Sequence, residues 1–160
     1  FMKENSKIDK KNIFLFVASQ GGFISALVAE QRREEIQGLL LLYPALCIPD
    51  DSRRGCVIGT KIDPNNVPDS FHGIFVKLGK KYVEDARTLD PYEQICTFKK
   101  PVLIIHGIED KLVKIEYSRK ANERYENCEL IEVHGDHGFI LKGFKAGKKA
   151  TAKYLKDLDL

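Results

Sequence analysis

The sequence predicts an α/β fold built on a parallel β-sheet, and three observations support this class. Four short apolar segments of strand length are present, at residues 13–18, 39–43, 102–106 and 130–133. The first three are almost continuously apolar, as expected for strands that are covered on both faces. Helical patterns lie between and after these segments. Strands that alternate with helices join into parallel sheets through right-handed crossovers.

Three segments have the spacing of amphipathic helices. Residues 22–35 place Phe23 and Ala26 on related faces and end in a charged turn. Residues 115–125 and 142–158 follow the third and fourth apolar segments and carry apolar side chains at helical intervals. Each predicted strand is therefore followed by a helix or by an insertion.

The stretch 46–99 interrupts this alternation between the second and third predicted strands. It holds four of the six prolines, its first part is rich in turn residues, and residues 74–86 are predicted to form a helix. A segment of this length between two strands of one sheet is commonly functional, often as a lid or cap. The 160 residues are therefore predicted to form one domain, 1–160, with a cap insertion at about 46–99.

Composition excludes several classes of partner. The net charge of +3 is small and the lysines are scattered, so a nucleic-acid surface is not expected. No apolar stretch approaches the ~20 residues of a membrane span, and the charged start lacks the apolar core of a signal peptide. The cysteines show no zinc-site spacing, so we expect reduced thiols and a cytoplasmic location; they are Cys47, Cys56, Cys96 and Cys128.

Ser19 stands between the first predicted strand and the first predicted helix, in the sequence V-A-S-Q-G. A strand–turn–helix context is the one in which a G-x-S-x-G elbow exposes a nucleophilic serine. Gly21 and Gly22 are expected to let the helix pack close to the strand. The N–H group of Gln20 would then face a developing oxyanion. A serine at such a turn can equally serve only as a helix N-cap.

Two further residues strengthen the catalytic interpretation of Ser19. Asp110 follows the third predicted strand and His137 follows the fourth. Parallel sheets carry their sites at the carboxyl ends of strands, so the three side chains are expected to meet. In such a triad the histidine takes the serine proton while a carboxylate holds the imidazole in place. Glu109 and Asp136 are alternative carboxylates of lower rank.

The other histidines have competing interpretations. His134 and His137 are close enough in sequence to suggest a metal pair, but no third ligand is evident. His106 ends a buried strand and is expected to be a core histidine with satisfied hydrogen bonds.

The chain resembles the α/β-hydrolase superfamily, specifically bacterial esterases of the feruloyl or cinnamoyl esterase kind. The matching stretches are SQGG, GLLLLYPA, LDPYEQI, KPVLIIHGIEDKLV and HGDHGF. The resemblance implies a serine carboxylesterase that forms an acyl-enzyme on hydroxycinnamoyl esters and needs no metal or organic cofactor. It makes Ser19 the nucleophile, His137 the base and then the acid, and Asp110 the orienting carboxylate, with the Gln20 N–H as an oxyanion donor.

The resemblance also bears on the predicted cap. Cap groups of this family can hydrogen-bond the phenolic end of an aromatic acid, and the positions that match them are Asp51 and Tyr82. A solvated turn and a packing tyrosine are the alternative interpretations of these two residues.

The sequence departs from the family in two ways. Val17 and Ala18 stand where such esterases usually carry Gly-His. The resemblance also begins only at the fifth core strand, so we expect the strand at 13–18 to have an unpaired apolar edge. This edge predicts a homodimer or other oligomer, or a chain that supplies the missing strands. A catalytically silent remnant that acts as a folded or partner-dependent module is the alternative function.

Overall fold

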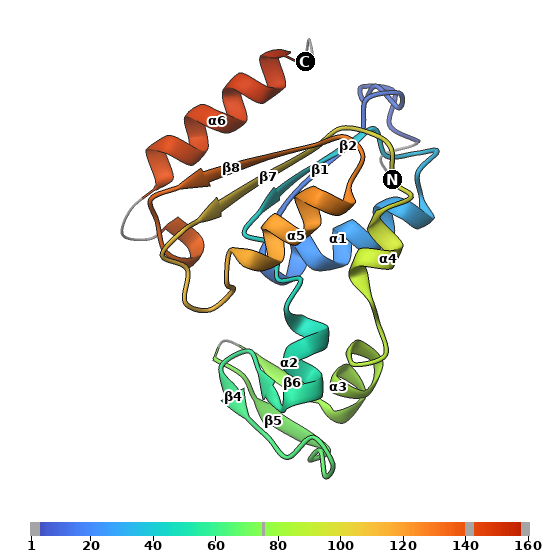
Figure 1. Cartoon of the computed structure of the whole chain (residues 1–160). Helices are drawn as coiled ribbons and strands as arrows, with labels where there is room; N and C mark the ends of the chain where they lie inside the picture. The colour runs from blue at the N-terminus through green and yellow to red at the C-terminus, as the bar shows by residue number, and fades with distance from the viewer. Residues whose placement is uncertain (1–3, 75, 140–142, 158–160) are drawn as a thin grey trace. The chain divides into compact units, whose positions relative to one another are not determined.

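A computed structural model describes residues 4–74, 76–139 and 143–157 of the chain (Figure 1). The chain divides into two compact units. The first, called here the α/β unit, comprises Phe1–Ala45 and Pro91–Leu160. The second, called the inserted unit, is Leu46–Asp90. The cap predicted at about 46–99 begins where the inserted unit begins. Its last part, from Pro91 onward, belongs to the α/β unit.

The α/β unit is built on a four-stranded sheet in the order β1-β2-β7-β8, and every neighbouring pair is parallel. The parallel sheet predicted from the sequence is thus confirmed. The strands coincide with the four apolar segments to within two residues; they are β1 (Phe14–Ala18), β2 (Gly38–Leu42), β7 (Val102–Gly107) and β8 (Cys128–Val133).

Helices cover both faces of this sheet (Figure 1). Helix α6 lies on one face, while α1, α4 and α5 lie together on the other. Their bounds are α1 (Ser19–Gln31), α4 (Pro91–Ile95), α5 (Glu116–Arg124) and α6 (Phe144–Asp157). The first helix therefore begins three residues earlier than its apolar spacing indicated, because it starts at the turn that carries Ser19.

Alternate residues of the strands supply the two halves of the core, because successive strand side chains point to opposite faces. Leu40, Leu103 and Ile105 form a buried cluster with Phe139, and Tyr154 and Leu155 of α6 pack against it. His106 falls between Ile105 and Gly107 and therefore points to the opposite face, toward α5. Every residue of β7 is buried, which explains why Val102–Ile105 are all apolar.

The inserted unit has short helices and two antiparallel strand pairs, β3–β4 and β5–β6. Its elements are α2 (Ile48–Arg54), β3 (Cys56–Val57), β4 (Thr60–Lys61), β5 (Ser70–His72), β6 (Lys77–Gly79) and α3 (Lys80–Ala86). They enclose a small separate core of five buried residues, Val57, Val67, Phe71, Leu78 and Val83.

The prediction of a single helix at 74–86 is wrong. Residues Lys77–Gly79 form β6, which pairs with Ser70–His72, and helix α3 begins only at Lys80. Strand pairing with a segment several residues earlier in the chain overrides the local helical pattern there. The turn-rich first part of the insertion also holds helix α2, which the sequence analysis did not anticipate.

In the part of the chain that the structure describes, no helix has both the length and the apolar character needed to cross a membrane.

Candidate active site

Ser19 occupies a sharp turn between β1 and α1. Its φ of 50° lies in the left-handed region, which is costly for a residue with a Cβ atom. The turn is held by a 2.9 Å hydrogen bond from the Ala45 N–H to the Ser19 carbonyl. The N-cap residue of α1 is Ala18, and no side chain makes a capping hydrogen bond there. The N-cap interpretation of Ser19 is therefore wrong.

The two glycines after this turn differ in what they do. A Cβ atom at Gly22 would lie 3.0 Å from Pro44 Cβ, tighter than most Cβ contacts, so glycine favours the close approach of α1 to the segment after β2. A Cβ atom at Gly21 would lie 3.6 Å from Val17 Cγ1, an ordinary van der Waals contact. The expected need for glycine holds at Gly22 and is wrong at Gly21.

Asp110 lies in the loop after β7, and both of its carboxylate oxygens have hydrogen-bond partners. Its Oδ1 accepts the N–H groups of Leu112 and Val113 at 2.9 and 2.8 Å, and its side chain is wholly buried. Burial raises the pKa of this carboxyl, but hydrogen bonds from His106, His137 and the Val113 N–H outweigh that effect. The net result holds the pKa of Asp110 well below its ordinary value, so it is a carboxylate near neutral pH.

His137 begins the short 3₁₀ turn His137–Phe139 that follows β8. Its loop is tied to the neighbouring loop through Glu109, whose carboxylate accepts a hydrogen bond from the Gly135 N–H and bonds His134 Nδ1 at 3.1 Å. Glu109 therefore anchors the backbone near His137, while Asp110 is the carboxylate that bonds the His137 ring.

The structure brings Ser19, His137 and Asp110 into one hydrogen-bonded chain. His137 Nδ1 lies 2.7 Å from Asp110 Oδ2, and His137 Nε2 lies 3.0 Å from Ser19 Oγ. An ionised carboxylate only accepts hydrogen bonds, so Nδ1 carries the hydrogen. Nε2 is then the acceptor for the serine hydroxyl. This is the arrangement in which a histidine can take the proton of a serine.

Gln20 is the second residue of α1, directly after Ser19. The N–H groups in the first turn of a helix have no acceptor within the helix and carry its partial positive charge. The Gln20 N–H therefore belongs to the group of donors that can stabilise an anion next to Ser19.

Tyr43 is a site residue that the sequence analysis missed. Its ring meets the His137 ring edge-on with centroids 4.7 Å apart, and it meets Phe139 at 5.0 Å. Burial, followed by the Asp110 charge, raises the pKa of the Tyr43 hydroxyl. The signal that could have identified it is its place directly after β2, at the same end of the sheet as Asp110 and His137.

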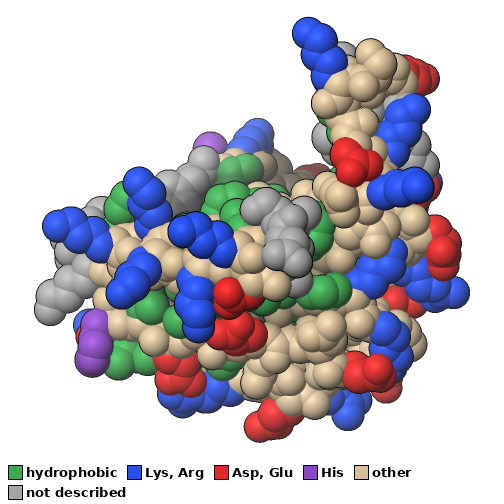
Figure 2. Space-filling view, turned by 90° about the horizontal axis from the view of Figure 1, so that it is seen from above, with side chains coloured by type: hydrophobic (Ala, Val, Ile, Leu, Met, Phe, Trp, Pro, Cys, Tyr) green, Lys and Arg blue, Asp and Glu red, His purple; other side chains and the backbone are tan. Residues whose placement is uncertain are grey.

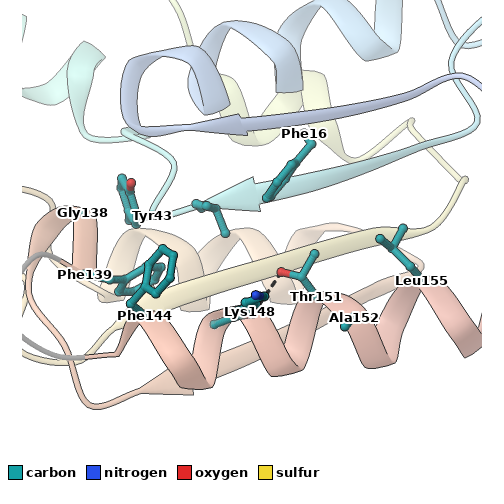
Figure 3. Close-up of a pocket in the computed structure, with 11 residues that line it drawn as sticks. Phe16, Tyr43, Gly138, Phe139, Phe144, Lys148, Thr151, Ala152 and Leu155 are labelled. Atoms are coloured by element: carbon teal, nitrogen blue, oxygen red, sulfur yellow. Dashed lines mark hydrogen bonds between the residues drawn. The ribbon is translucent and has the colours of Figure 1, made fainter.

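An apolar groove of about 390 Å³ lies beside these rings, between α6 and the sheet (Figure 3). Phe16, Phe139, Phe144 and Leu155 line it together with Tyr43. Phe16 and Phe144 are 59% and 68% exposed. Figure 2 shows this side of the molecule, where hydrophobic side chains reach the surface among Lys and Arg side chains.

Comparison with known proteins places this geometry in a fold family. No family model matches the sequence, and no curated protein matches it. Among solved structures, Est1E from Butyrivibrio proteoclasticus is 30% identical with a TM-score of 0.87, and the match covers 99% of this chain. MGS-MChE2, an α/β-hydrolase enzyme from the metagenome of lagoon sediments, is 16% identical with a TM-score of 0.68 over 94% of this chain.

The chain has a partial α/β-hydrolase fold. It spans 65% of the length of Est1E and 64% of MGS-MChE2. Est1E has also been solved with ferulic acid bound, and that structure gives a TM-score of 0.88 at the same 30% identity. The resemblance inferred from the sequence motifs is thus confirmed at the level of the fold.

Within this α/β-hydrolase fold, the two residues matched to a phenol-binding role lie in the inserted unit. Asp51 is on α2 and is paired with Arg54. Tyr82 is on α3, which packs against α2. The Tyr82 hydroxyl is buried with no hydrogen-bond partner among the described residues. Burial, with smaller effects of Cys47 and Asp51, raises its pKa to about 12.

The metal interpretation of His134 and His137 finds no support in the α/β-hydrolase loops. Their partners are the carboxylates Glu109 and Asp110, respectively. Residues 4–74, 76–139 and 143–157 contain no group of three or more His, Cys, Asp or Glu side chains arranged to hold a metal ion.

Proposed function

We propose that the chain hydrolyses carboxylic esters through a covalent acyl-enzyme on Ser19. The observation that carries this proposal is the continuous hydrogen-bonded chain from Ser19 Oγ through His137 to the buried Asp110 carboxylate. The similarity to Est1E, at 30% identity over 99% of this chain, supports the same conclusion.

In this mechanism His137 Nε2 removes the Ser19 proton as Oγ attacks the ester carbonyl carbon. The new C–O bond leaves a tetrahedral oxyanion, which the Gln20 N–H group stabilises. His137, now cationic and paired with Asp110, returns the proton to the alcohol as its C–O bond breaks. A water molecule, activated by His137 in the same way, then releases the acid and restores Ser19.

We propose hydroxycinnamoyl esters, such as feruloyl esters, as the substrate class. The support is the structure of Est1E with bound ferulic acid, together with two polar groups of the inserted unit. The Tyr82 hydroxyl is a buried group without a partner among the described residues, and the Asp51 carboxylate lies close enough to raise its pKa. A phenolic hydroxyl is a ligand that could bond both.

A serine-directed phosphonate probe and two substrate types test the proposal. We expect the probe to label Ser19 and the protein to hydrolyse methyl ferulate but not a peptide amide. The Ser19→Ala variant should lose the label and about 10⁶-fold of the rate. Ser25→Ala, which changes a serine on the same helix, is the matched control. A folded protein with neither label nor hydrolysis would favour the catalytically silent module instead.

We further propose that the chain associates through β1, as a homodimer or with another chain. This strand is one of the two outer strands of the described sheet, and Phe16 at its centre is 59% exposed. An exposed apolar edge strand is a template for pairing with another strand. Light scattering at micromolar concentration should show an oligomer that Phe16→Lys dissociates. A wild-type protein that is a stable monomer would refute this association.

A further inference from the structure

His106 is a second histidine that contacts the candidate catalytic carboxylate. It lies on β7, its side chain is wholly buried, and its Nε2 is 3.3 Å from Asp110 Oδ2. The same Nε2 is 2.9 Å from the Val113 carbonyl oxygen. The expectation of a satisfied core histidine is therefore met, but one of its contacts reaches the oxygen that also bonds His137.

The partners of the ring define which nitrogen carries the hydrogen. Both atoms that face Nε2, a carboxylate oxygen and a carbonyl oxygen, can only accept a hydrogen bond. Nε2 must therefore be protonated. On the other side, Nδ1 lies 2.6 Å from Ser118 Oγ, and Ser118 is itself fully buried on α5. When the Ser118 hydroxyl donates to Nδ1, the ring carries a hydrogen on Nε2 alone and is neutral.

We propose that His106 and Ser118 are positioning residues for Asp110. The Ser118 hydroxyl donates to His106 Nδ1, and the neutral ring shares its Nε2–H between Asp110 Oδ2 and the Val113 carbonyl. The His106 ring of β7 thereby contacts the loop that carries Asp110 at two atoms, Asp110 Oδ2 and the Val113 carbonyl oxygen, and contacts α5 through Ser118. Oδ2 then has two donors, His137 Nδ1–H and His106 Nε2–H, and Oδ1 has the two backbone N–H groups already described.

A neutral donor suits this place better than a cation would. The carboxylate must stay ionised and oriented while His137 gains a positive charge during the reaction. Hydrogen bonds lower the pKa of Asp110, and a neutral ring does so without adding a charge that would oppose the developing imidazolium. Tyr43 is a further titratable group near Asp110: burial, and then the Asp110 charge, raise the pKa of its hydroxyl.

The first test needs no variant and no substrate. Nitrogen-15 NMR of histidine-labelled protein at neutral pH should show His106 as the neutral tautomer with hydrogen on Nε2. A cationic His106 ring, or one with hydrogen on Nδ1, would overturn the proposal.

The second test follows the Asp110 carboxyl by carbon-13 NMR during acid titration. In His106→Leu, which keeps the volume but removes the donor, Asp110 should protonate at higher pH than in the wild type. In His106→Gln, whose amide N–H can replace Nε2–H, most of the shift should be reversed, and Ser118→Ala should give a smaller shift. Ala121→Gly, which loosens the same helix at another buried position, should leave the titration unchanged. Equal titrations in the wild type and His106→Leu would refute the proposal.

The functional consequence rests on the proposed ester hydrolysis and is measured separately. We expect His106→Leu to lower kcat about tenfold with little change in KM, because the general base is less well held. His106→Gln should recover most of that loss. If no variant and no wild-type protein hydrolyses esters while both NMR results are as expected, the positioning network stands and the proposed reaction fails.

Discussion

The α/β unit and the inserted unit are held together in different ways. The strands of the α/β unit pair in register over four to six residues and are buried between helices. The inserted unit has strand pairs of only two and three residues. There, side chains bond the backbone of distant segments: Arg53 donates to the carbonyls of Arg87 and Leu89 at 3.0 and 2.6 Å, and Thr60 donates to His72 O at 2.7 Å.

This difference explains where sequence patterns are informative. A strand that is buried on both faces must be apolar throughout, so the pattern and the structure coincide. A strand pair of two or three residues is too short to leave a clear alternating pattern in the sequence. The prediction of one helix at 74–86 failed because Lys77–Gly79 pairs with Ser70–His72 instead.

The largest expected effect is a loss of catalytic rate that leaves the folding of the inserted unit unchanged. Asp110→Asn should lower kcat for ester hydrolysis about 10⁴-fold, because the amide presents a donor to His137 Nδ1 and favours the wrong tautomer. Hydrogen exchange of residues 46–90 should stay as in the wild type. A large change of exchange in the inserted unit would show that the two units are not separable in this way.

A smaller effect concerns acid stability of the α/β unit. The pKa of Asp110 is lowered in the folded protein. Such a group stabilises the fold above its unfolded pKa, and the contribution is lost as the pH falls through the folded pKa. Urea unfolding from about pH 7 to about pH 3 should therefore show the stability advantage of the wild type over Asp110→Asn shrinking below about pH 4. A constant difference would contradict this assignment.

Arg53 tests the inserted unit by itself. Arg53→Ala removes two hydrogen bonds to backbone carbonyls and should cost about 1–2 kcal/mol of local stability, since Arg53 is partly exposed. Arg53→Lys keeps the charge but not the planar fork, so it should lose part of that amount. Hydrogen exchange should accelerate in residues 46–90, with little change in β2 and β7. Equal acceleration of hydrogen exchange in both units would show that Arg53 does not stabilise the inserted unit by itself.

The last pair of variants distinguishes two adjacent glycines of α1. Gly22→Ala should destabilise the fold by about 1–3 kcal/mol, because the new methyl group meets Pro44. Gly21→Ala meets only an ordinary contact with Val17 and should be neutral or stabilising by up to about 1 kcal/mol. Thermal unfolding of the two variants measures both. The reverse order would show that the turn at Ser19 is not packed as described.

The sheet was predicted from the apolar segments of strand length. The meeting of Ser19, Asp110 and His137 was predicted from their positions directly after the strands. Both are local properties: burial on two faces dictates an apolar strand, and parallel strands end at one edge of the sheet. The two glycines of α1 differ from this, because the sequence favours glycine at both positions while only Gly22 has a close neighbour, Pro44, that a side chain would meet.

The sequence by itself determined the fold class, the strand order along the chain and the three residues that converge. Only the tertiary structure decided that Glu109 bonds His134 and the Gly135 N–H, and that Tyr43 and His106 belong to the same cluster as Asp110 and His137. The reason is physical. Which way a loop side chain points, and which hydrogen-bond partners remain to it, depends on backbone atoms and rings contributed by β2, β7, β8 and α5, and the spacing of residues within one segment carries no information about those neighbours.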